Sequence, residues 1–326
     1  MKLRKKRLGR TDYRVSQLCL STSNFSRYAS REESWAILES FREAGGNFIQ
    51  TSGICPGVNL GDGFLGMPEE VLGAWLKLRR IERSSMVIAT RIAFTRPVIG
   101  GLPTYIDLVR RCVGDSIRRI GCGYLDLLVV EWTDGIAPVV ESMAAFEAVV
   151  ASGEVRAVVP ANFRSADVRE ALAASRRVPG TIAGIQFDYS LAARSGFESG
   201  IAKLSGDHQL ALIARAPLAA GRLAGNQLST VVGGLGQYTD TPDSAAAANA
   251  IWPALFAIAQ KRHQASAQLA LSWVLMQPQV TSVLVSVRST DQLSELLAAT
   301  RFELSGEELA RLDRLPVRPA RAAIAA

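Results

Sequence analysis

The sequence has few of the side chains that bind transition metals, with two His and four Cys among its 326 residues. The cysteines follow neither a zinc-site spacing nor a CxxC pattern; they are Cys19, Cys55, Cys112 and Cys122. Because a tetrahedral zinc site needs several such ligands close together, we expect no metal centre.

Long apolar runs are also missing. No stretch of 18 apolar residues occurs, and the basic start of the chain is not followed by the apolar segment of a signal peptide. We therefore expect a cytoplasmic protein without a membrane partner. The net charge is +7, but the only dense basic run is residues 4–7. Such a run is typical of the exposed face of a strand or hairpin, so we expect no nucleic-acid partner either.

Short apolar segments alternate with helical patterns along the chain. Hydrophobic residues make up 48% of the sequence, enough for a sizeable core. Eight segments of four to six residues have the composition of strands that are buried on both faces; they are residues 17–20, 47–50, 86–89, 125–130, 155–159, 182–186, 210–214 and 282–285. The amphipathic segments between them predict helices over residues 31–44, 68–78, 104–119, 138–150, 165–175, 246–261, 265–276 and 290–299. Eight strands that alternate with helices predict a single-domain α/β fold, a (β/α)8 TIM barrel.

Three further segments complete the expected organisation. The start of the chain predicts a β-hairpin ahead of the first barrel strand. Residues 51–67 and 219–244 are long, glycine-containing loops that follow strands, so they should lie on the carboxyl-terminal face where barrel enzymes build their sites. The Ala- and Arg-rich tail, residues 316–326, is expected to be disordered.

Seven stretches carry a resemblance to a known family. They read, in order, LGRTDYRVSQLCLS, AGGNFIQTS, SIRRIGCGYLDLLVVE, ASGEVRAVVPANF, GIQFDYSL, IARAPLAAGRLAG and SAQLALSWVLMQPQVTSVLVSVRSTDQL. In this order and spacing the chain resembles the aldo-keto reductase superfamily from residue 8 to residue 315. The resemblance implies a barrel that reduces carbonyls with NADPH.

The resemblance also implies four catalytic positions, and all four are substituted here. The family uses a tyrosine acid, a lysine paired with an aspartate, and a histidine that orients the substrate. In this chain the four positions are occupied by Cys55, Arg91, Gln50 and Glu131. Arg91 keeps a positive charge, but a guanidinium does not give up its proton. Cys55 lacks the reach of a phenol, and Gln50 carries no charge, so the family's ordinary proton transfer is not expected.

Glu131 has two interpretations. A glutamate at a strand end in a water-poor cleft is a candidate acid or base. Beside Arg91 it is equally suited to a structural ion pair. The sequence leaves both interpretations open.

The cofactor positions are better kept. Asn162 and Gln186 align with the side chains that hold the nicotinamide carboxamide in the family. Further matches fall on segments that run beside the pyrophosphate and the adenosine; these are Arg215, Leu218, Gly221, Arg222, Arg288, Gln292 and Glu295. The resemblance thus implies NADP(H), with retention of these residues as scaffold alone as the alternative.

Three functions fit these observations. The first is an atypical NADP(H)-linked oxidoreductase that acts on a specialised small molecule. The second is a non-redox enzyme in the same pocket, performing a dehydration, cyclisation or isomerisation with Glu131 as acid or base. The third is a homologue without catalysis that works by binding a ligand or partner.

Overall fold

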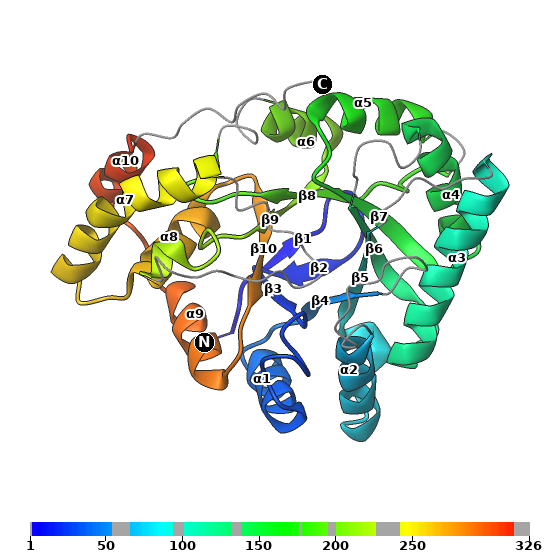
Figure 1. Ribbon diagram of the computed structural model, residues 1–326, viewed down its shortest axis with the longest axis horizontal. Coiled ribbons are helices and arrows are strands. Elements are labelled where there is room, and N and C mark those ends of the chain that lie inside the picture. Colours follow the sequence, from blue (N-terminus) through cyan, green and yellow to red (C-terminus); the bar gives the residue numbers. More distant parts are fainter. Residues whose placement is uncertain are drawn as a thin grey trace.

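Eight parallel strands form a closed barrel surrounded by helices in the computed structural model (Figure 1). The structure describes residues 2–53, 66–93, 101–131, 138–175, 178–194, 200–225 and 242–315. The barrel strands are, in chain order, β3 (Leu18–Ser21), β4 (Phe48–Ser52), β5 (Val87–Ala93), β6 (Leu125–Glu131), β7 (Val155–Ala161), β8 (Gly184–Asp188), β9 (Ala211–Arg215) and β10 (Val280–Ser286). β10 pairs with β3 and closes the ring. The predicted (β/α)8 barrel is therefore confirmed.

Burial on both faces explains the composition of these strands. Outside the sheet, side chains of the strands pack against the helices in one large apolar cluster. A second cluster, which includes Cys19, Phe48, Leu127, Val159 and Ile213, comes from the opposite face of the strands and fills the barrel interior. The interior is thus packed, and only the strand ends are left to form a site.

Ten α-helices are described, most of them on the outside of the barrel. They are α1 (Arg31–Glu43), α2 (Met67–Leu78), α3 (Gly101–Ile120), α4 (Val139–Ala151), α5 (Ser165–Ala174), α6 (Ala202–His208), α7 (Pro242–Lys261), α8 (Ser266–Met276), α9 (Thr290–Ala299) and α10 (Gly306–Asp313). Several begin at side-chain caps; for example, Ser30 Oγ accepts a hydrogen bond from the Glu33 amide at the start of α1. None of the helices in the described ranges is long and apolar enough to cross a membrane.

The predicted elements agree with the structure in number and order for the barrel strands. Boundaries move by a few residues; β5, for example, continues to Ala93, four residues beyond the predicted end. The short helices α6 and α10 were not predicted. The predicted disordered tail lies outside the described residues, as does most of the predicted loop over residues 219–244.

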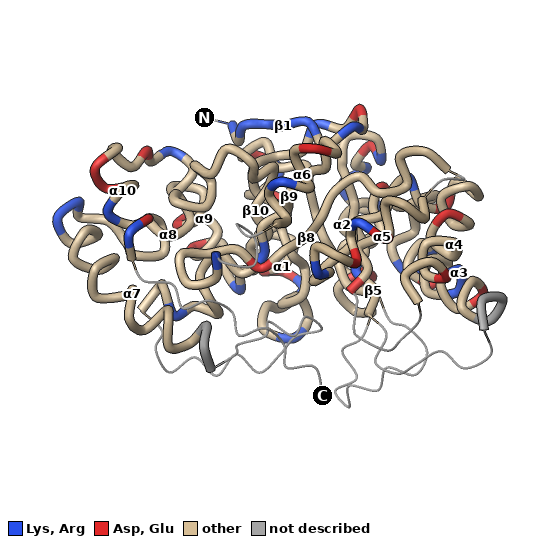
Figure 2. The backbone as a smooth tube through the Cα atoms, turned by 90° about the horizontal axis from the view of Figure 1, so that it is seen from above, with Lys and Arg blue, Asp and Glu red and all other residues tan. Residues whose placement is uncertain are grey.

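The predicted N-terminal hairpin is present and covers the amino-terminal end of the barrel. Its strands are β1 (Lys5–Arg7) and β2 (Arg14–Ser16), and they pair antiparallel. Lys6 Nζ donates to the Val280 carbonyl oxygen at 2.7 Å, at the start of β10. Figure 2 shows the blue β1 at the edge of the molecule opposite the grey segments. The hairpin therefore leaves the carboxyl ends of the strands as the end available for a site.

Candidate active site

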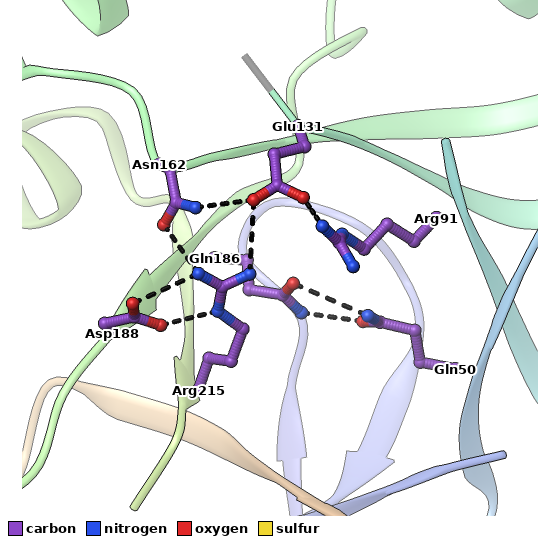
Figure 3. Close-up of polar contacts among 7 residues, drawn as sticks. All are labelled: Gln50, Arg91, Glu131, Asn162, Gln186, Asp188 and Arg215. Carbon is purple, nitrogen blue, oxygen red and sulfur yellow. Dashed lines mark hydrogen bonds and ion pairs between the residues drawn. The ribbon is translucent and has the colours of Figure 1, made fainter. Parts of the chain in front are cut away.

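Polar and charged side chains collect at the carboxyl-terminal rim of the barrel (Figure 3). The strands β4, β5, β6, β8 and β9 each contribute at least one of them, and Asn162 follows β7 directly. Five of these side chains are buried; they are Gln50, Arg91, Glu131, Gln186 and Arg215. Since parallel strands end at the same rim, residues far apart in the chain meet here.

Arg91 and Glu131 form the buried ion pair that the sequence analysis considered. Arg91 Nη2 contacts Glu131 Oε2, and the two side chains are only 7% and 9% exposed. Ala93, two residues beyond Arg91, is the register partner of Glu131 on the neighbouring strand, which places both side chains on the inner side of the rim. Burial and then the positive charge of Arg215 lower the pKa of Arg91 to about 9. Arg91 therefore remains a cation near neutral pH.

A second arginine connects Glu131 to an aspartate. Arg215 Nη1 lies 3.5 Å from Glu131 Oε1. The same guanidinium binds Asp188 with two bonds, from Nε to Oδ1 at 2.5 Å and from Nη2 to Oδ2 at 3.1 Å. Two buried cations thus alternate with two carboxylates, so their formal charges cancel. A balanced set of this kind avoids an uncompensated charge in the barrel mouth.

Asn162 bridges the two halves of this network. Its Nδ2 donates to Glu131 Oε1 at 2.8 Å, and its Oδ1 accepts from Arg215 Nη2 at 3.1 Å. The backbone of Asn162 has a φ of 61°, in the left-handed region that asparagine tolerates better than most residues. This turn directly after β7 is what aims the amide back over the rim. We call the set Arg91, Glu131, Asn162, Arg215 and Asp188 the rim network.

Gln50 and Gln186 form a separate pair across the barrel. Gln186 Nε2 donates to Gln50 Oε1 at 2.6 Å, and Gln50 Nε2 lies 3.5 Å from Gln186 Oε1. They stand on β4 and β8, which are not neighbours in the sheet. The neutral pair fills the floor beneath the rim network without adding charge.

A buried carboxylate ties α2 to α3 and to β5, next to Arg91. Glu69, at the start of α2, is fully buried; it accepts from Arg119 Nε at 2.6 Å and from Thr90 Oγ1 at 3.3 Å. Burial raises the pKa of Glu69, although the Arg119 charge opposes the shift. Beside it, the Gly53 amide donates to the Arg91 carbonyl oxygen at 2.9 Å. The backbone next to Arg91 is therefore held by contacts from α2 and α3. Cys55, two residues after Gly53, lies outside the described residues.

A different group of polar residues lies where β3 and β10 end. The hydroxyl groups of Ser21, Ser23 and Ser286 form a short chain, with oxygen–oxygen distances of 3.0 and 3.5 Å. The exposed Arg288 guanidinium stacks over the Tyr28 ring, 4.4 Å from its centroid. No ion pair is found for Arg288 within the described ranges.

The start of α9 is occupied by the chain's own acceptors. Glu33 Oε1 accepts from the Thr290 amide at 2.6 Å, and Gln292 Oε1 accepts from the Arg288 amide at 2.8 Å. Gln292 and Glu295 lie on the exposed side of this helix. Leu218 and Gly221 lie in the turn after β9, and Arg222 begins the short 3₁₀ helix η3 (Arg222–Ala224).

The structure therefore brings together only part of the predicted set. Gln50, Arg91, Glu131, Gln186 and Arg215 meet at the rim with Asn162. The residues expected beside the pyrophosphate and the adenosine instead follow β9 and β10 or lie on α9. Asp188 was missed. It lies two residues beyond the predicted end of its strand, and its placement opposite Arg215 depends on the strand register.

Comparisons with known proteins agree with this architecture. The model of the aldo/keto reductase family matches residues 17–316. An uncharacterized oxidoreductase of Bacillus subtilis, YrpG, is 28% identical over 317 residues, covering 94% of each chain. The protein tas of Escherichia coli is 27% identical over 94% of this chain and 96% of its own length. The NADH-specific methylglyoxal reductase of Escherichia coli is 27% identical over 82% of each chain.

The family match, the barrel fold and the named relatives agree with one another. The matched region contains the whole barrel and every residue of the rim network. Relatives named as oxidoreductases support an oxidoreductase-type function. The chain belongs to the aldo/keto reductase family.

Proposed function

We propose that this chain is an NADP(H)-linked oxidoreductase that acts on a small molecule at the barrel rim. In this proposal Glu131, at the position of the family's histidine, takes over the proton transfer of the usual phenol, and Arg91 stands at the position of the lysine. The supporting observation is the rim network itself. Two arginines and two carboxylates are held at a barrel mouth, the place where this fold builds its sites. Buried charged groups in such a position are more often functional than buried charges elsewhere.

The chemistry of the available side chains suits the cofactor. The amides of Asn162 and Gln186 have the donors and acceptors that a carboxamide needs, and Arg288 offers an exposed cation to a phosphate. Bound NADPH would supply the hydride. The protein's own task is then to hold the substrate oxygen and to move a proton.

Arg91 holds the substrate oxygen and Glu131 moves the proton. Arg91 stabilises negative charge on the substrate oxygen, because its guanidinium is already fixed in a buried site. Glu131 exchanges the proton, because a carboxyl group can do so near neutral pH and a guanidinium cannot. Arg215 and Asp188 hold Glu131 in place from the other side.

One observation favours a second candidate, a pocket that works without a nucleotide. The side chains of Asn162 and Gln186 are already hydrogen-bonded within the chain. A closed network of this kind also suits a non-redox reaction in which Glu131 shuttles a proton, or a protein that only binds its ligand.

Titration of the purified protein with NADPH, followed by nucleotide fluorescence, separates these functions. The oxidoreductase proposal predicts saturable binding at or below millimolar nucleotide. A flat titration up to millimolar NADPH, on protein shown to be folded by circular dichroism, would contradict it and favour the second candidate. Asp188→Asn serves as an internal check, since loosening Arg215 should alter the affinity of a genuine rim site.

A further inference from the structure

We infer that Glu131 and the nicotinamide carboxamide compete for the Asn162 side chain, so that nucleotide binding releases Glu131 for proton transfer. The inference rests on the proposed function. It concerns how the chain's own residues are coupled, and it explains why a cofactor position can be kept although its hydrogen bonds are already used.

Both ends of the Asn162 amide are engaged. Its Nδ2 donates to Glu131 Oε1 at 2.8 Å, and its Oδ1 accepts from Arg215 Nη2 at 3.1 Å. A carboxamide placed against Asn162 therefore has to replace at least one of these bonds. Both partners are charged, and hydrogen bonds to charged groups are roughly twice as strong as neutral ones. Competition at Asn162 thus weakens nucleotide binding.

Breaking the existing hydrogen bonds of Gln186 costs nucleotide binding less free energy. Its partner is the neutral Gln50, with one short bond of 2.6 Å and a second contact of 3.5 Å. An exchange of one neutral amide partner for another is close to balanced. The dominant competitor is therefore the charged Glu131 rather than Gln50.

Asn162 can leave the network without leaving a buried charge unpaired. Without it, Glu131 still contacts Arg91 and Arg215. Arg215 likewise keeps both bonds to Asp188. Removing Arg91 or Arg215 would instead leave an uncompensated carboxylate. Asn162 is thus the member of the network whose partner can change at least cost.

The exchange changes what Glu131 can do. While Asn162 donates to it, Oε1 is covered by that amide and by Arg215. When Asn162 turns to the carboxamide, one donor leaves Oε1, and this oxygen becomes free to exchange a proton with the substrate, giving it up as NADPH delivers the hydride or accepting it in the reverse reaction. Coupling of this kind is reciprocal, so a change that weakens the Glu131–Asn162 bond must strengthen nucleotide binding.

Calorimetric titration with two ligands tests the coupling. NADPH carries the carboxamide, whereas adenosine 2′,5′-bisphosphate presents only the adenosine half. We expect Glu131→Gln to raise the affinity for NADPH by about five-fold, because a charged acceptor becomes neutral. The affinity for adenosine 2′,5′-bisphosphate should not change. Glu170→Gln, at an exposed position on α5, is the matched control and should change neither.

The single variant Asn162→Ala completes the test, and its own result does not depend on the folding of Glu131→Gln. It should lower the affinity for NADPH towards that for adenosine 2′,5′-bisphosphate, and it should abolish the effect of Glu131→Gln in the double variant. If NADPH binds the wild type but Glu131→Gln leaves the ratio of the two affinities unchanged, or if Asn162→Ala leaves the NADPH affinity unchanged, the inference is wrong and the proposed function stands. If NADPH binds neither the wild type nor any folded variant, the inference and the proposed function are both wrong.

Discussion

At the scale of single residues, Glu131 determines the charge balance of the site. It contacts both buried arginines of the rim network, whereas Asp188 contacts only Arg215. Removing the charge of Glu131 would therefore leave two buried cations facing one carboxylate. Breaking a buried pair on one side is strongly destabilising, because the remaining charge has lost its partner without regaining water.

We accordingly expect Glu131→Gln to lower the free energy of unfolding by about 3–5 kcal/mol. Urea denaturation followed by circular dichroism would measure it, with Glu170→Gln as the exposed control. A change below about 0.5 kcal/mol, the usual scatter of surface substitutions, would show that the pair is not structural. Loss of activity with unchanged stability would then assign Glu131 to proton transfer alone.

At the scale of secondary-structure elements, the close contact of α2 with α3 depends on a glycine. A Cβ on Gly73 of α2 would lie 2.4 Å from the Ile120 carbonyl oxygen at the end of α3. These two helices also carry the ion pair between Glu69 and Arg119, and Glu69 contacts Thr90 of β5, next to Arg91. Helix packing on the outside of the barrel thus supports the rim.

Two alanine substitutions in these helices should have opposite effects. Gly73→Ala should destabilise the protein by about 1–3 kcal/mol, because backbone atoms would have to move apart. Gly114→Ala, in the interior of α3 with no atom within 4 Å of the added Cβ, should stabilise it by about 0.5–1 kcal/mol. Thermal unfolding measures the melting temperature of both variants. Equal shifts of the same sign relative to the wild type would contradict the described helix contact.

The hairpin carries a pH-dependent contact. Burial, and then the negative charge of Asp126, raise the pKa of Tyr13 to about 12 from its usual value of 10.0. Because the pKa is higher in the folded state, the contribution of Tyr13 to stability is complete below about pH 10 and is lost as the pH rises towards 12.

Tyr13→Phe should therefore reduce the loss of stability between pH 10 and pH 12. Urea denaturation at intervals across this range would measure the difference between the two proteins. An absorbance titration of tyrosinate in the folded protein should also show one ionisation fewer near pH 12 in the variant. Identical pH profiles would show that Tyr13 titrates normally.

The elements also show what sequence patterns can predict. The eight barrel strands were found because each is an apolar run buried on both faces. The helices α6 and α10 were missed because seven or eight residues are too few to show an apolar period, and only α10 has a Ser–x–x–Glu start.

The polar cluster at the rim was predicted in position but not in its hydrogen bonds and ion pairs. Strand ends indicated which residues face the rim, and the Arg91–Glu131 contact was anticipated. The bonds of Asn162 and Asp188 to Arg215 could not be predicted, because they depend on the register of β8 and β9 and on the left-handed turn after β7. The catalytic and cofactor roles of these residues stay predictions.

At the scale of the whole molecule, the barrel of the family is intact, and we infer that its proton-transfer groups are replaced. We expect reduction of ordinary test aldehydes with NADPH to be slower than in the family by about 10²–10⁴-fold, the usual contribution of general acid catalysis. Consumption of NADPH, followed by its absorbance, measures this. Turnover at about 1–10³ s⁻¹, typical of enzymes, would show that the four positions are wrongly assigned.

Restoring a single group should not rescue this activity. Cys55→Tyr would return a phenol, but in the proposed assignment Gln50 and Arg91 would still occupy the positions of the family's aspartate and lysine. The same absorbance assay applies, with Cys122→Tyr, away from the rim, as a control. A large gain in Cys55→Tyr alone would mean that the rim network already supports a phenol.

The hairpin at the amino-terminal end of the barrel also concentrates positive charge at that end. Residues 2–14 contain seven Lys or Arg and one Asp, so they carry six of the seven net positive charges of the chain. The rim network at the other end is balanced within itself. The basic hairpin lies at the end of the barrel away from the rim, so an anion attracted to it by charge would not meet the mouth of the barrel.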